Sequence, residues 1–135
     1  MLNRRYLRIK VLQALYSWFQ ADNDDLPKAE KEMLDSISKV YDLYLLMLLL
    51  VIEVVDSAES LMETQKLKNF ATDEELDPNL HFIENKAVNL LRNNVEFGRA
   101  IVAKRINWGI HSDVIRKLYV NIEKSDLYKK YMLVE

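Results

Sequence analysis

The first twenty residues carry apolar side chains at helical spacing. These side chains recur every three or four positions, so they share one side of an α-helix. We therefore predict a helix over residues 3–20 that buries this stripe, which comprises Leu7, Val11, Ala14, Leu15 and Trp18. The polar stretch ADNDDLP that follows predicts a turn, with Pro27 in the first turn of the next helix.

A second helical pattern extends from about residue 28 to beyond residue 62. Its apolar positions alternate in steps of three and four, which is typical of the seam of a helical bundle or coiled coil. Residues 43–52 are apolar nearly all round the helix, so this part must be covered on more than one side. We expect either the centre of a core or a buried interface, with Leu46, Leu49 and Leu50 as the candidate interface residues.

Shorter helical patterns follow a polar loop over residues 68–81, in which Thr72 and Glu75 fit a capping box. They predict helices at about residues 82–93 and 95–104, and two more that begin at the expected N-caps Ser112 and Ser125.

The 135 residues include only 2 Gly and 2 Pro, which suits long helices better than strands joined by turns. The sequence thus predicts one all-α domain, a bundle of about five to seven helices with one long central helix.

Residues for catalysis are scarce. The chain has no cysteine, which excludes disulfides, thiol catalysis and cysteine-based zinc sites and favours a cytoplasmic location. Its two histidines, His81 and His111, stand in separate loop-like contexts, and solvated loop histidines explain them better than a metal site does. The apolar run at 44–55 is interrupted by Glu53 and is shorter than the roughly 20 residues of a membrane span. We expect a protein that is not an enzyme and has no cofactor and no metal.

Charge is distributed unevenly along the chain although the net charge is only −2. Positions 1–20 hold four bases and no acid, positions 22–96 hold 17 acids and 7 bases, and positions 99–130 hold 8 bases and 3 acids. Local charge sets the local potential because salt screens interactions beyond about 8 Å. The basic start of the chain is therefore a candidate surface for a polyanion.

Three arginines of the first helix flank the stripe that we expect to be buried. Arg4 and Arg8 lie one turn apart at its border, and Arg5 lies further round, on the side of Tyr16. A guanidinium group can donate two hydrogen bonds to one phosphate, and a tyrosine ring can stack on an unpaired base. These side chains suit single-stranded RNA, but they also fit a solvated helix end whose arginines pair with acids of residues 22–35.

The segment RRYLRIKVLQALYSW resembles the first helix of the bacterial NusB family of transcription antitermination factors, in which an RRxxR element precedes QALYSW or a close variant. The resemblance covers about 20 residues. It implies an all-helical RNA-binding protein that binds the boxA element of nascent ribosomal RNA, with Arg4, Arg5, Arg8 and Tyr16 as RNA contacts. It also implies the ribosomal protein NusE as a partner.

The family's INEAVELAK-like and FVNGVLD-like stretches do not occur in this chain. We therefore expect either the N-terminal part of a longer, divergent member or a NusB-like first helix joined to a different bundle. In the first case NusE binding needs the rest of the protein. The alternative function is a helical interaction or dimerisation module without RNA binding, so a homo-oligomer is also open.

Overall fold

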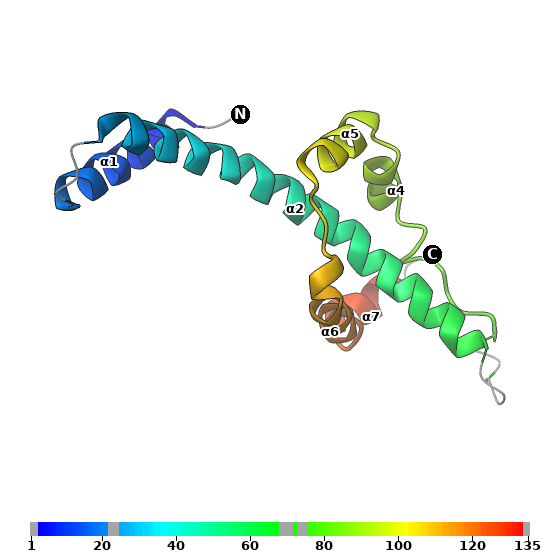
Figure 1. Cartoon of the computed structure of the whole chain (residues 1–135). Helices are drawn as coiled ribbons and strands as arrows, with labels where there is room; N and C mark the ends of the chain where they lie inside the picture. The colour runs from blue at the N-terminus through cyan, green and yellow to red at the C-terminus, as the bar shows by residue number, and fades with distance from the viewer. Residues whose placement is uncertain (1–2, 22–24, 68–71, 73–75, 134–135) are drawn as a thin grey trace. The chain divides into compact units, whose positions relative to one another are not determined.

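The computed structural model of the chain describes residues 3–21, 25–67, 72 and 76–133. In these residues the chain forms six α-helices and one short 3-10 turn, and no strand (Figure 1). The prediction of an all-α bundle with one long helix is confirmed. The elements are α1 (Arg4–Gln20), α2 (Leu26–Lys66), α4 (Lys86–Arg92), α5 (Val95–Lys104), η1 (Gly109–His111), α6 (Ser112–Glu123) and α7 (Asp126–Met132).

The chain divides into two compact units, unit 1 (Met1–Tyr44) and unit 2 (Leu45–Glu135), and α2 contributes to both. Unit 1 contains α1 and the first part of α2 (Figure 1). Its helix ends follow the capping rules. The Asn3 side chain accepts a hydrogen bond from the Arg5 backbone N–H at 3.0 Å, and that of Asp25 accepts one from the Lys28 N–H at 3.0 Å.

None of the described residues of unit 1 is buried. Leu7, Ala14 and Trp18 of the predicted stripe are half-buried, but Val11 and Leu15 are 41% and 44% exposed. The expectation that the whole stripe is buried is therefore wrong. Within unit 1 the helix α1 meets only one other helix, which cannot cover a stripe as wide as this one.

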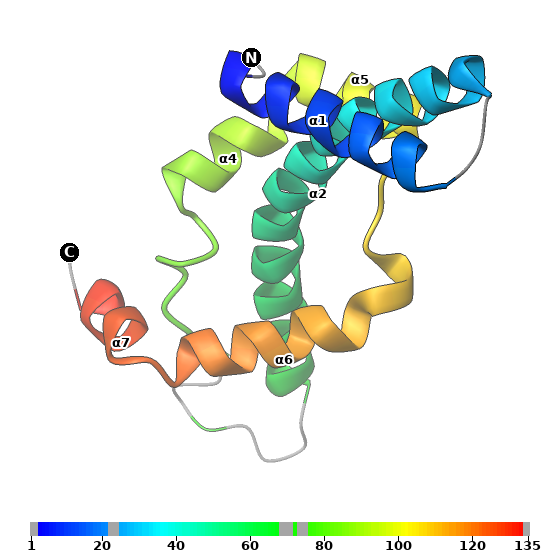
Figure 2. The ribbon, with the colours of Figure 1, turned by 90° about the vertical axis from the view of Figure 1, so that its left-hand side faces the viewer.

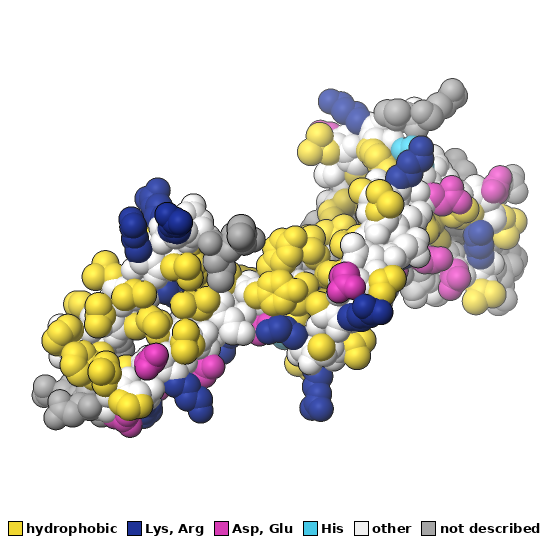
Figure 3. Space-filling model, turned by 90° about the horizontal axis from the view of Figure 1, so that it is seen from above, with side chains coloured by type: hydrophobic (Ala, Val, Ile, Leu, Met, Phe, Trp, Pro, Cys, Tyr) yellow, Lys and Arg dark blue, Asp and Glu magenta, His cyan; other side chains and the backbone are white. Residues whose placement is uncertain are grey.

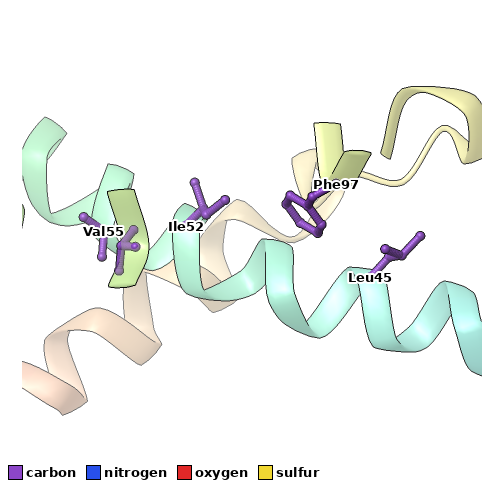
Figure 4. Packing of buried hydrophobic residues seen from close by; sticks show 5 residues of the cluster. Leu45, Ile52, Val55 and Phe97 are labelled. Carbon is purple, nitrogen blue, oxygen red and sulfur yellow. The ribbon is translucent and has the colours of Figure 1, made fainter. Parts of the chain in front are cut away.

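Unit 2 holds the core, which forms on two stripes of α2. On one stripe, Leu45, Ile52 and Val55 pack against Val88 of α4 and Phe97 of α5. Figure 4 shows the Phe97 ring directed toward α2 between Leu45 and Ile52. On the other stripe, buried side chains of α2 meet buried side chains of α6. These are Val54, Ala58, Ile115 and Tyr119.

The short helices of unit 2 begin at side-chain caps that fix where each one starts. Asn85 caps α4 by accepting from the Ala87 N–H at 2.9 Å, and Asn94 caps α5 by accepting from the Phe97 N–H at 2.9 Å. Figure 2 shows α4, α5 and α6 arranged about the later turns of α2. These helices cover two stripes of the apolar middle of α2 within unit 2, but Met47 and Val51 stay 52% and 47% exposed, so the expected cover is incomplete.

Two of the predicted helix starts are wrong. The first helix after the loop begins at Lys86 and not near residue 82, because Asn85 caps it and residues 81–84 form a separate turn. Ser112 is not an N-cap. The 3-10 turn η1 runs directly into α6, so Ser112 already has helical dihedral angles. The Ser125 cap is confirmed, since its hydroxyl accepts from the Tyr128 N–H at 3.2 Å. The proposed Thr72–Glu75 box lies partly outside the described residues.

Candidate nucleic-acid interface

The basic end of α1 is the strongest candidate for a binding surface. Arg4, Arg5 and Arg8 are all exposed, and no acid stands in the first turn of α1. Figure 3 shows a group of Lys and Arg side chains at one end of unit 1 with a field of hydrophobic side chains beside it. Arg4 and Arg5 lie in the first turn of α1, at the positive end of the helix dipole, where a base is unfavourable and an anion is favoured, and Arg8 lies one turn beyond Arg4. Helix stability alone therefore gives no reason to place two bases in this first turn.

The guanidinium groups have no acidic partner in the described part of the chain. None of the ion pairs there involves Arg4, Arg5 or Arg8. Arg8 in particular is not paired with Glu30 or Asp35, although both acids stand on α2 within unit 1. Each of these exposed arginines carries five N–H donors, which is a set suited to binding a phosphate.

Tyr16 lies on the same side of α1 as Arg5. At 100° per residue the two differ by about 20° around the helix, and eleven residues at 1.5 Å separate them by about 16 Å along its axis. The Tyr16 ring is 67% exposed, so its face is accessible. A ligand that contacts both residues must extend along the helix.

Sequence reasoning missed one side chain near this surface. Phe19 is 72% exposed and lies one turn beyond Tyr16, where its ring meets that of Trp18 edge to face at 4.9 Å. Phe19 falls outside the predicted buried stripe. An aromatic residue at such a position was the sequence signal for an exposed ring. Lys10, in contrast, lies about 140° round α1 from Arg5, with its ammonium nitrogen 5.7 Å from the centre of the Tyr6 ring. Phe19 adds a second stacking ring to the arginine and tyrosine set.

The candidate interface leucines lie in unit 2. Leu49 packs against the core stripe that includes Ile52, and Leu50 packs against the stripe that includes Val54. The carbonyl oxygen of Leu46 accepts a hydrogen bond from the Trp108 indole N–H at 3.0 Å. All three side chains are half-buried. Their role in binding another chain stays a prediction.

The two histidines have structural neighbours. His81 is half-buried with its ring 4.5 Å from that of Tyr131, and His111 is exposed with its ring 6.1 Å from that of Trp108. In the described ranges, no three His, Cys, Asp or Glu residues are grouped so that they could hold a metal ion. Nor does any helix of those ranges combine the length and the apolar character needed to cross a membrane.

Comparison with known proteins gives no relative. The chain matches no protein-family model, no curated protein and no solved structure. The interpretation of α1 therefore depends on its residues, their exposure and the short resemblance to the NusB first helix.

Proposed function

We propose that this chain is an RNA-binding transcription antitermination factor of the NusB kind, which binds single-stranded, boxA-like RNA along α1. The observation that carries the proposal is the set of three exposed arginines in the first two turns of α1, which have no acidic partner among the described residues. Charge and hydrogen-bond donors bind the phosphates, and the exposed rings of Tyr16 and Phe19 stack on unpaired bases. The protein acts in ribosomal RNA transcription in the cytoplasm and has no catalytic role.

NusE is the proposed protein partner only in a longer protein. The sequence resemblance is confined to the first helix, and the family's later motifs do not occur in this chain. The RNA site lies on α1 and does not depend on those motifs. RNA binding by this chain alone is thus the part of the proposal that can be tested first.

Fluorescence anisotropy with a labelled boxA-like RNA across a salt series tests the proposal. A protein that contacts about three phosphates of a single strand gives a slope near −2 in a plot of log affinity against log salt concentration. A scrambled RNA of the same length is the control for sequence preference. Absence of binding at low salt would exclude the function for this chain, and binding without salt dependence would exclude the arginines as its source.

A second candidate function is protein interaction without RNA binding. The absence of buried residues from the described part of unit 1, together with its many exposed apolar side chains, favours it. In that case the arginines only keep a helix end solvated. Replacement of Arg5 by alanine would then leave every binding property of the protein unchanged.

A further inference from the structure

Unit 1 has an open apolar groove between α1 and the start of α2. The groove has a volume of about 310 Å³, and all but one of its lining side chains are apolar. None of the described residues of unit 1 is buried, so these side chains are at most half-buried. A contiguous apolar surface of this kind on a soluble protein marks an interaction site. The lining residues are Val11, Ala14, Leu15, Trp18, Leu26, Ala29, Glu30 and Met33.

The two walls of the groove have the spacing of a helix-binding site. α1 ends at Gln20 and α2 begins at Leu26, so the two helices form an antiparallel hairpin (Figure 1). The lining residues stand at positions 11, 14, 15 and 18 of α1 and at positions 26, 29, 30 and 33 of α2, which is the series i, i+3, i+4 and i+7 on both helices. Each wall therefore runs along its helix axis for about 10 Å. Apolar grooves of this form bind the apolar stripe of an amphipathic helix, which has the same period.

The open end of the hairpin adds positive charge to the groove. Arg4 and Arg8 continue the α1 wall toward that end in steps of four and three residues, and both are exposed. In the described residues neither arginine is in an ion pair. On α2, Ile37 and Tyr41 continue the opposite wall toward the same end without adding charge. The single acid of the lining, Glu30, stands nearer the turn. The groove is thus apolar along its length and positive at one end.

We propose that the groove binds an amphipathic α-helix of another polypeptide, with acidic side chains at the end of that helix next to Arg4 and Arg8. The apolar stripe of the bound helix fills the groove and adds a third helix to the hairpin, while its acids pair with the two guanidinium groups. A second copy of this chain does not supply this pattern, because its own groove lining offers one acid for two arginines. Fourteen positions separate Arg4 from Trp18, so the bound helix needs about 14 residues to span about 21 Å.

The inference goes beyond the proposed function and does not depend on RNA binding. Arg5 and Tyr16 lie about 120° and 140° round α1 from Val11, outside the groove. Arg5→Ala should therefore weaken RNA binding and leave binding of the helix unchanged. A chain that binds no RNA but binds the helix would refute the proposed function alone.

Two synthetic peptides of about 15 residues test the charge of the partner. Both have leucines at i, i+3, i+4 and i+7, and one carries two glutamates at one end where the other carries two lysines. In fluorescence anisotropy with the full chain, the glutamate peptide should bind about tenfold more tightly than the lysine peptide. Arg8→Glu should abolish this preference, since it leaves one base and one acid at the open end of the groove. Absence of binding by the glutamate peptide, or equal binding of both peptides by the wild type, would overturn the proposal.

A pair of substitutions on α1 tests the location. Leu15→Gln places a polar group in the groove and should weaken binding of the glutamate peptide about tenfold. Leu12→Gln is the matched control, because Leu12 is 68% exposed and lies about 100° round α1 from Val11, outside the lining. Circular dichroism of both variants verifies that they fold. An equal loss of binding in the two variants would overturn the proposal.

The same variants exclude other occupants of the groove. Light scattering of the wild type alone should give the mass of a single 16.0 kDa chain, and vesicles of anionic phospholipid should not bind it. Self-association that Leu15→Gln abolishes would assign the groove to a second copy and overturn the proposal. Vesicle binding that Leu15→Gln abolishes would assign it to a lipid surface, with the same consequence.

Discussion

The indole N–H of Trp108 donates a hydrogen bond to the carbonyl oxygen of Leu46 at 3.0 Å, joining residues 62 positions apart in the sequence. Through this bond the segment before α6 is fixed to α2 within unit 2. The other tryptophan, Trp18, differs in the hydrogen bonding of its indole group. Its indole nitrogen is buried in unit 1 without a hydrogen-bond partner in the described residues. The two tryptophans therefore make different contributions to stability.

Replacing each tryptophan by phenylalanine should separate these contributions. Trp108→Phe removes a satisfied hydrogen bond and should lower the free energy of unfolding by about 1 kcal/mol, in addition to any loss of packing. Trp18→Phe removes a buried donor that has no partner among the described residues and should cost less or be neutral. Urea unfolding followed by circular dichroism measures both. Equal losses in the two variants would show that the hydrogen bond to Leu46 contributes nothing measurable.

Tyr119 predicts how stability changes at alkaline pH. Burial, then a hydrogen bond and charge interaction with Tyr128, raise the pKa of Tyr119 above its ordinary value of 10.0. The folded state thus holds a proton that the unfolded chain releases above about pH 10. Stability associated with Tyr119 should be complete below that pH and should fall as the pH rises further. Tyr119→Phe should flatten this fall, and thermal melts from about pH 8 to 11 check it. An unchanged slope in the variant would contradict the buried, protonated state.

Much of the fold follows from the hydrophobic pattern, because periodicity reports directly on helices. The pattern predicts α1, α2 and α5 to within two or three residues at the ends that can be compared, and the start of α7 at its Ser125 cap. The start of α4 was missed because Asn85 sits inside a longer apolar pattern, where only its cap geometry reveals the boundary. Periodicity says where a helix lies but not how its ends are capped.

Some features of the candidate site could likewise be predicted from the sequence, and others could not. The charge and spacing of Arg4, Arg5, Arg8 and Tyr16 were visible in the sequence, and the structure adds that all four are exposed. The exposure of Leu15 could not be predicted, since an apolar stripe shows that a side chain needs cover and not whether a neighbouring helix supplies it. The absence of an Arg8–Glu30 pair from the described residues likewise depends on packing between two helices, which no local pattern specifies.

The separation of Arg5 and Tyr16 predicts a minimum length for the RNA. Their spacing of about 16 Å along α1 corresponds to about five stacked nucleotides at roughly 3.4 Å each. Tyr16→Ala should therefore weaken the binding of an eight-nucleotide RNA by about 1–3 kcal/mol and leave that of a three-nucleotide RNA nearly unchanged. Anisotropy titrations with both lengths measure this difference. The same loss for the two lengths would mean that the RNA does not run along α1.

The substitution Arg5→Glu tests the central claim most directly, because it should move stability and RNA binding in opposite directions. The introduced carboxylate would complement the helix dipole in the first turn of α1, so the variant should be more stable than the wild type by about 0.3–1 kcal/mol. RNA binding should weaken at least about tenfold, since a phosphate donor is replaced by a negative charge. Thermal melts and RNA titrations of the same preparation measure both quantities. A variant that is more stable and has lost RNA affinity is the predicted result, whereas unaltered affinity would contradict RNA binding by the basic end of α1.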